Sequence, residues 1–419
     1  MYYNLNMENK TNVIKIIPRE RYMKKVRPFI GSELIKVFTG IRRSGKSVML
    51  ELIQKELKKS GINSKNIISY NFEKIANSKL CNSEALYKEL SKIIKKKKDK
   101  VYLFFDEIQE VENWEKCINS CRLDFDCDIY ITGSNAKLLS SELATYLAGR
   151  YVEFIVYPFS FQEFLETKKE SNTAINVSKE FQNYIEFGGM PFLTNLKESK
   201  EASFQYLKDV YNSVILKDVV KRNNIRDIDL MERIINYVIV NIGQTFSSTS
   251  LSKYFKSENR KVSHDTILNY IKACSDAFLL YKINREEVST KKILSINEKY
   301  YIADHALREA IYGQKFNDIS QVLENIICLE LLRRSFKIRV GKVGTKEIDF
   351  VAEKNGELIY IQVAYLLASK EIIDREFGVY KNIKDNYPKY VLSLDEFDMS
   401  MNGIKHKNIR DFLLDDTWG

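Results

Sequence analysis

The segment that most constrains this chain is Gly40–Ser47, with the sequence GIRRSGKS. Two glycines spaced in this way, followed by Lys and Ser, let a short loop curl so that its backbone N–H groups point inward at phosphate oxygens. The apolar run Leu34–Thr39 precedes the loop, and Val48–Ser60, which has helical periodicity, follows it. A strand, a glycine loop and a helix in this order predict a phosphate-binding loop, with the positive end of the helix dipole against the phosphates.

The side chains of this loop have distinct expected roles. Lys46 would reach the β- and γ-phosphates of a nucleoside triphosphate, and the hydroxyl of Ser47 would ligate Mg²⁺. We therefore expect ATP and Mg²⁺ as cofactors. The expected nucleotide-binding residues are the loop and the residue after it: Gly40, Ile41, Arg42, Arg43, Ser44, Gly45, Lys46, Ser47 and Val48.

A second motif, Val101–Glu107 (VYLFFDE), is an apolar strand that ends in two carboxylates. Asp106 is placed to hold the shell of a magnesium ion. Glu107 is placed to polarise an attacking water as a general base. Such a strand end is common on its own, but downstream of the glycine loop it predicts hydrolysis of a nucleoside triphosphate.

A third polar segment ends the next strand, Asp128–Thr132. Ser134 and Asn135 lie there, where a polar side chain beside the γ-phosphate would orient the attacking water. The alternative is that one of them caps a helix that starts near Ala136. Both interpretations stay open from the sequence.

Apolar strands alternate with helical segments over this first part of the chain, which predicts an α/β fold with a parallel sheet covered on both faces. The expected strands are Leu34–Thr39, Asn66–Phe72, Val101–Phe105, Asp128–Thr132 and Val152–Val156, and the expected helices are Val48–Ser60, Ser83–Lys96 and Trp114–Asp124.

The remaining chain is expected to form further units, since 419 residues suggest two to four domains at roughly 100–200 residues each. Phe187–Phe192 (FGGMPF) predicts a hinge. Turn residues Asn355-Gly356 between extended runs predict a hairpin. The expected division is an ATPase domain over residues 1–170, a helical linker over 171–225, a winged-helix-like domain over 226–295 and an α/β domain over 296–419.

The third of these units has helix-turn-helix spacing. Ser250–Phe255 and His264–Lys272, the latter capped by Ser263, are expected helices, and Phe278–Asn284 turns extended, as a wing would. Basic residues near the second helix suit contact with phosphates: Arg260, Lys261, His264 and Lys272. DNA binding and a purely structural coupling role both stay open.

Several segments together resemble prokaryotic AAA+ P-loop ATPases that carry a C-terminal domain of unknown function. The segments are IRRSGKS, FFDEIQEVENWE, ITGSNAKLLSSELATYLAGRY, YPFSFQEF, FGGMPF, ILKDVV and EIDFVAE, which span nearly the whole chain. The resemblance implies an AAA+ core, a winged-helix middle and a C-terminal domain similar to restriction endonucleases.

The same resemblance implies further site residues. Arg150, after Gly149, would stabilise charge on the γ-phosphate within its own subunit or from a neighbouring one. A structural ion pair is the alternative, and Arg42 and Arg43 compete for the role. Arg19 and Tyr22, which precede the first strand, are expected near the adenine.

In the C-terminal part the resemblance points to a nuclease of the PD-(D/E)xK type. Glu330, Asp349 and Gln362 occupy suitable positions to bind Mg²⁺, but Ala364 stands where a Lys would orient water. This departure favours a degenerate domain that binds nucleic acid or protein without cleaving; an active Mg²⁺-dependent nuclease is the alternative.

Bulk composition adds weaker limits. A net charge of +10 permits nucleic-acid contact without requiring it. Six scattered cysteines without a CxxC pair predict free thiols in a reducing cytoplasm rather than a metal site. The polar N-terminus has no signal core, and no stretch approaches the roughly 20 apolar residues of a membrane span. A homo-oligomer is expected if Arg150 acts across subunits.

Overall fold

A sheet of five parallel strands carries the glycine loop. The structure, a computed structural model, describes residues 16–136, 147, 149–169, 175–196, 199–313 and 319–418. The strands β1 to β5 have the spatial order β2-β3-β4-β1-β5, and each pair is parallel. Their bounds are Ile35–Thr39 (β1), Ile67–Asn71 (β2), Val101–Asp106 (β3), Cys127–Thr132 (β4) and Tyr151–Ile155 (β5). The predicted α/β class is confirmed.

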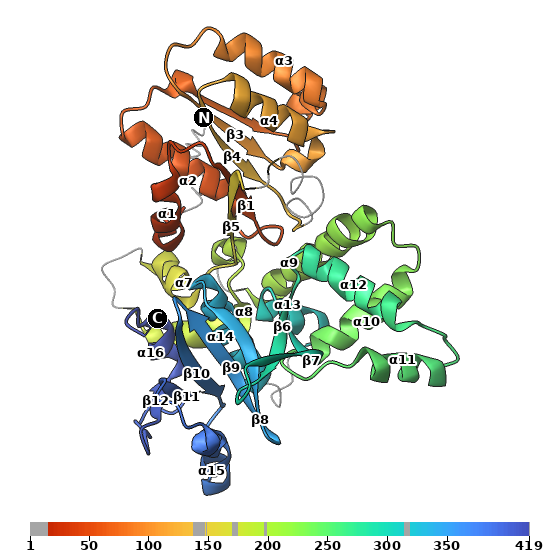
Figure 1. Cartoon of the computed structure of the whole chain (residues 1–419), viewed down its shortest axis with the longest axis vertical. Helices are drawn as coiled ribbons and strands as arrows, with labels where there is room; N and C mark the ends of the chain where they lie inside the picture. The colour runs from red at the N-terminus through yellow and green to blue at the C-terminus, as the bar shows by residue number, and fades with distance from the viewer. Residues whose placement is uncertain are drawn as a thin grey trace, which may run out of the picture.

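Helices cover both faces of this sheet (Figure 1). The helices α1 (Glu20–Val26) and α2 (Lys46–Lys59) pack on one face, and α3 (Ser83–Ile94) and α4 (Trp114–Asp124) on the other. Successive strand residues point to opposite faces. The core therefore has two layers, and the central strands β1, β3 and β4 are buried along their whole length.

A helical body follows. After α8 (Val177–Phe187), its helices are α9 (Lys200–Ser213), α10 (Ile228–Val240), α11 (Ser248–Ser257), α12 (His264–Asp276) and α13 (His305–Tyr312), and the π-helical segment η6 (Val214–Lys221) continues α9 directly. Apolar residues of α9 to α13 and η6 share one core with Ile41 of the glycine loop. As predicted, Ser263 caps α12, because its hydroxyl accepts the N–H of Thr266 at 3.1 Å.

The FGGMPF segment is a tight junction between these bodies. A Cβ on Gly189 would lie 2.2 Å from the carbonyl oxygen of Phe159, and Gly188 adopts a left-handed φ of 76°. The N–H of Gly189 donates to the carboxylate of Asp304 at 2.8 Å, and the N–H of Phe159 donates to the carbonyl of Gly189 at 2.7 Å. Only glycine fits both positions, so this segment ties the end of the first sheet to the start of α13.

A seven-stranded mixed sheet forms the last body, in the order β12-β11-β10-β9-β8-β6-β7. Its bounds are Leu280–Glu287 (β6), Lys292–Ile302 (β7), Lys337–Val343 (β8), Lys346–Lys354 (β9), Glu357–Val363 (β10), Lys389–Ser393 (β11) and Lys405–Asn408 (β12). Asn355 and Gly356, both left-handed, form the predicted hairpin turn between β9 and β10. The segment Phe278–Asn284, expected as a wing, contributes to β6, which pairs with both β7 and β8, so the sheet crosses the boundary expected between residues 295 and 296.

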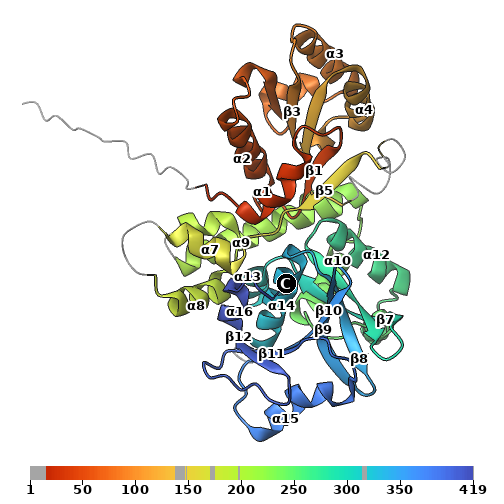
Figure 2. The ribbon, with the colours of Figure 1, turned by 60° about the vertical axis from the view of Figure 1, so that its left-hand side comes forward.

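Helices from distant parts of the sequence pack on this second sheet. Residues of α7 (Phe161–Lys168), α8, α14 (Ile319–Arg333) and α16 (Ile409–Leu414) share its larger core, and α15 (Lys370–Gly378) packs with the smaller one. Figure 2 shows α7 and α8 at the left, below the first sheet and close to α16. The core of the last body therefore takes in α7, which was expected to end the first domain. The short 3-10 segments are Arg27–Phe29, Ser64–Asn66, Ile75–Leu80, Ile108–Glu110, Pro191–Asn195 and Val379–Asn382.

Candidate nucleotide site

The glycine loop joins β1 to α2 in a conformation that needs its glycines. Gly40 and Gly45 have φ values of 134° and 100°, and Arg43 is also left-handed at 69°. A Cβ on Gly40 would lie 2.3 Å from the carbonyl oxygen of Val156, directly after β5. The neighbouring strand therefore fixes the start of the loop, and the loop ends where α2 begins at Lys46.

Lys46 lies buried inside the loop. Its ammonium donates to the carbonyl of Gly40 at 3.1 Å and to that of Ile41 at 3.2 Å. Burial lowers the pKa of Lys46, and the carboxylates of Glu107 and Asp218 oppose that shift. The amino group of Lys46 is thus held at the centre of the loop, where an anionic ligand would meet it.

The carboxylate of Asp106, at the end of β3, lies beside Ser47. Ser47 Oγ donates to Asp106 Oδ1 at 3.0 Å, Thr132 Oγ1 donates to the same oxygen at 2.6 Å, and Asn71 Nδ2 donates to Oδ2 at 2.7 Å. A hydroxyl and a carboxylate in contact fit Mg²⁺, which takes one or two protein oxygens together with phosphates and water. Among the residues that the structure describes, no cluster of three or more His, Cys, Asp or Glu side chains forms a full protein cage.

Glu107 follows in a strained backbone conformation. It is left-handed, with φ 54°, which is uncommon for a residue with a side chain. Its N–H donates to Thr132 Oγ1 at 2.8 Å, and Gln109 donates to its carboxylate. Thr132 at the end of β4 therefore positions both Asp106 and Glu107, a role that sequence reasoning did not assign.

Ser134 meets two residues that the sequence did not single out as site residues. Its hydroxyl donates to Asp218 Oδ1 at 3.0 Å, and Arg222 lies 3.3 Å from Ser134 Oγ. Arg42 of the loop donates to both oxygens of Asp218, at 3.0 and 3.2 Å. Burial would lower the pKa of Arg42, but hydrogen bonding to Asp218 raises it. Asn135 is also buried here. Asp218 lies in the ILKDVV segment, which carried part of the family resemblance but gave Asp218 no predicted role.

Arg150 lies away from the glycine loop. Its carbonyl accepts the N–H of Ile35 at 3.0 Å, so it sits at the amino end of β1 and β5. The glycine loop follows the carboxyl end of β1, roughly 16 Å away at about 3.3 Å per residue. A role for Arg150 at the phosphates of its own subunit does not fit this geometry, and a role in a neighbouring subunit stays a prediction. Arg43 is exposed at the loop.

Arg19, expected near the adenine, is buried beneath the loop. Its guanidinium donates to both carboxylate oxygens of Glu163, at 2.8 and 3.1 Å. It also donates at 2.9 Å to the carbonyls of Ser44 and Tyr157. The hydroxyl of Tyr22 accepts the N–H of Tyr157 at 3.0 Å. Arg19 therefore ties the loop to α7.

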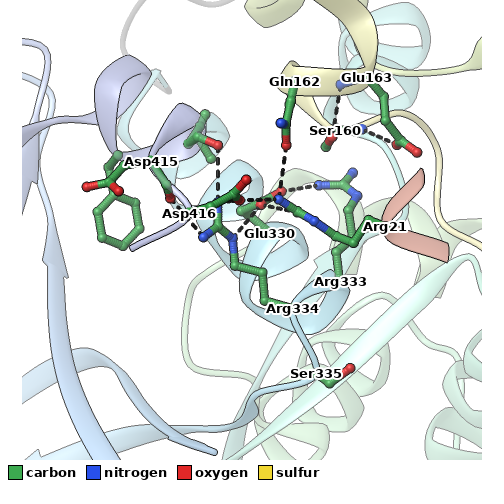
Figure 3. Close-up of polar contacts among 12 residues, drawn as sticks. Arg21, Ser160, Gln162, Glu163, Glu330, Arg333, Arg334, Ser335, Asp415 and Asp416 are labelled. Carbon is green, nitrogen blue, oxygen red and sulfur yellow. Dashed lines mark hydrogen bonds and ion pairs between the residues drawn. The ribbon is translucent and has the colours of Figure 1, made fainter. Parts of the chain in front are cut away.

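Of the three residues expected as a vestigial nuclease site, Asp349 and Gln362 lie together and Glu330 lies apart. Figure 3 shows Glu330 bound by Arg21, Arg333 and Arg334, at 2.6, 3.3 and 2.7 Å. Asp349 instead accepts the N–H of Val363 at 2.9 Å, and its own N–H donates to Gln362 at 3.3 Å.

The carboxylates near Asp349 share a lysine. Lys299 Nζ lies 3.1 Å from Glu324, 2.8 Å from Glu347 and 3.7 Å from Asp349. The helix carboxylate nearest this cluster is thus Glu324 rather than Glu330. Ala364, which stands at the expected Lys position, is buried.

The basic residues Arg260, Lys261, His264 and Lys272 of the helix-turn-helix segment are all exposed. Arg260 also donates to Asp229 at 2.7 Å. All six cysteines are free. In the part of the chain that the structure describes, no helix is long and apolar enough to cross a membrane.

Comparison with protein families gives two matches. Residues 32–165 match the family described as AAA domain, and residues 178–318 match a domain of unknown function (DUF8612). An uncharacterized protein of Haemophilus influenzae is 36% identical over 400 residues, which cover 95% of this chain and 99% of that protein. An uncharacterized protein of Methanocaldococcus jannaschii is 32% identical over 427 residues, which cover 99% of this chain and 90% of that protein.

Solved structures resemble parts of the chain at low identity. The Walker-type ATPase PABY2304 of Pyrococcus abyssi is 14% identical, with a TM-score of 0.49, over 71% of this chain and 96% of that one. AMPPCP-bound DnaA from Aquifex aeolicus is 17% identical, with a TM-score of 0.33, over 60% of this chain and 85% of that one.

Proposed function

Since the chain belongs to the same family as these Haemophilus influenzae and Methanocaldococcus jannaschii proteins and carries an AAA domain, we propose that it binds ATP with Mg²⁺ and hydrolyses it. One observation carries the proposal. The hydroxyl of Ser47 and the carboxylate of Asp106 are in contact at 3.0 Å, at the mouth of the loop that holds Lys46. That contact joins two motifs far apart in the sequence into one site.

The proposed roles follow from the chemistry of each group. Lys46 and the N–H groups at the start of α2 bind the phosphates. Ser47 and Asp106 would hold Mg²⁺, which would neutralise charge on the transferred phosphoryl group. Glu107, whose backbone is fixed by Thr132, accepts a proton from the attacking water.

Turnover of ATP with Mg²⁺ tests this proposal. Glu107→Gln removes the base and keeps the shape of the side chain, so turnover should fall by about 100-fold or more while ATP binding persists. Glu110→Gln, on the exposed residue three positions further on, is the matched control and should turn over ATP like the wild type. Equal rates in the wild type and Glu107→Gln, or no turnover in the wild type, would remove the proposal.

We further propose that ATP turnover is coupled to the helical body. Ile41 of the loop packs in the same core as α9 to α13, which supports a mechanical connection.

We also propose DNA as a candidate partner, because His264, Leu268 and Lys272 are exposed at four-residue spacing along α12. Such spacing lines one helix face.

A labelled duplex tests the DNA partner. Anisotropy titrations at several salt concentrations should show binding that weakens with salt and is lost in Lys261→Glu/Lys272→Glu. No binding at low salt would exclude DNA as a partner.

The free cysteines support a reducing cytoplasm as the location of the protein.

A further inference from the structure

One buried carboxylate beside the nucleotide site has no part in the proposed chemistry. Asp218 lies on η6, with its side chain 1% exposed. It accepts two hydrogen bonds from Arg42 of the glycine loop, at 3.0 and 3.2 Å, and one from Ser134 after β4, at 3.0 Å. Arg222 pairs with it at 3.3 Å. A single carboxylate thus accepts hydrogen bonds from the glycine loop and from the segment after β4, and it pairs with the arginine that follows η6.

These donors are groups that would otherwise serve a phosphate. Arg42 lies within the loop itself, and Ser134 follows the strand beside β1, where the third phosphate of ATP is expected. Carboxylate and phosphate oxygens accept the same paired hydrogen bonds from a guanidinium. Asp218 is also close enough to Lys46 to raise the lysine's pKa against the effect of burial. A γ-phosphate and the Asp218 carboxylate are both negatively charged and would therefore compete for the same hydrogen-bond donors.

We infer that Asp218 is an internal competitor of the γ-phosphate, so that ATP but not ADP takes over Arg42 and Ser134 and releases η6. The inference rests on the proposed function, because it assumes that ATP occupies the loop. ADP lacks the third phosphate and leaves the contacts of Asp218 intact. The contacts of Asp218 would then differ between the ATP-bound and the ADP-bound protein.

The segment that carries Asp218 is suited to respond. It is a π-helix, a rare and less regular form that is frequent at functional sites, and it continues α9 without a break. Val214, Ile215 and Val219 of the same segment pack in the core of the helical body. Arg42 also pairs with Glu73 at 3.1 Å, so it stays oriented when Asp218 leaves. Release of one carboxylate would reach the helical body through this packing.

Nucleotide affinities of Asp218→Asn test the inference. The amide keeps the shape of the side chain and removes its charge. Dissociation constants for Mg²⁺ complexes of ADP and of AMPPNP, a non-hydrolysable ATP analogue, are measured by calorimetry on the full chain. We expect the preference for AMPPNP over ADP to rise about tenfold relative to the wild type. Asp209→Asn, on the exposed face of α9, is the control and should leave the preference unchanged.

Each other outcome is decisive. If both affinities shift equally, or neither shifts, Asp218 is purely structural and the inference fails while the proposed function stands. If the wild type binds neither nucleotide, the proposed function fails and takes the inference with it.

Hydrogen exchange on the wild type gives a reading that does not depend on the variant folding. Amides of residues 214–221 should exchange faster with AMPPNP than with ADP. Equal exchange with the two nucleotides would overturn the inference.

Discussion

Replacing Arg19 with Met is the most direct way to test how the glycine loop is held. The guanidinium is 1% exposed and donates four hydrogen bonds, two of them to Glu163 and two to backbone carbonyls. Arg19→Met keeps the apolar length of the side chain but leaves the Glu163 carboxylate buried without its cation. Glu163 retains one partner, the N–H of Ser160 at 3.0 Å.

The expected cost follows from these contacts. Removing one partner of a buried ion pair costs about 3–5 kcal/mol, and the retained bond to Ser160 favours the lower end of that range. With a urea dependence of about 2 kcal/mol per molar, the unfolding midpoint of the first sheet should fall by roughly 1.5 M. Arg27→Met is the matched control. Arg27 pairs with Glu20 and Glu56, but it is 40% exposed, so its loss should cost less than about 1 kcal/mol.

Tryptophan fluorescence can follow the first sheet separately. The chain has two tryptophans: Trp114, the first residue of α4, lies in the core of the first sheet, and Trp418 stacks on Phe412 in the last body. In a Trp418→Phe background the signal reports the first sheet alone. A midpoint for Arg19→Met that lies as close to the wild type as that of Arg27→Met would refute the reasoning.

Three further predictions follow from particular contacts. Burial would raise the pKa of Glu330, but Arg333, Arg21 and Arg334 lower it below 4.5. The stability lost in Glu330→Gln should therefore be constant above about pH 5 and shrink as the pH falls below that. A difference in melting temperature that is equal at all pH values from 7 to 3 would contradict this. Gly40→Ala should abolish binding of fluorescent ATP, because its Cβ would lie 2.3 Å from a backbone oxygen, whereas Gly31→Ala, also at positive φ but in open space, should bind normally; equal binding would contradict the role of the loop. Incubation of DNA with the protein and Mg²⁺ or Mn²⁺ should give no cleavage, and cleavage that Asp349→Ala abolishes would show that the nuclease centre is active.

The sequence predicted the first sheet and the core of the site because both depend on local pattern and sheet geometry. Apolar strands separated by helices indicate a parallel sheet, and the carboxyl ends of its strands must meet at one edge. Gly40–Ser47, Asp106 and Ser134 each follow such a strand end, so their meeting was predictable. The contact between Ser47 and Asp106 is the result.

Contacts that depend on packing between distant segments were not predictable in the same way. Asp218 reaches Arg42 across 176 positions of sequence, through a π-helix that no periodicity indicates. Glu330 and Glu324 lie six residues apart on α14, roughly 240° around the helix, so they cannot face the same site. The apolar pattern of α14 does not predict which of the two carboxylates faces Asp349. In the structure Glu330 pairs with Arg21 of α1 instead.

The identity of the nucleotide retained by the protein tests the central claim most directly. Wild type, Glu107→Gln and Glu110→Gln are incubated with labelled ATP and Mg²⁺, passed rapidly through a desalting column and analysed for bound nucleotide. The wild type and Glu110→Gln should carry mainly ADP, and Glu107→Gln should carry ATP, because it keeps Lys46, Ser47 and Asp106 but lacks the base. The same nucleotide on all three proteins, or none on any, would contradict an ATPase built on the glycine loop.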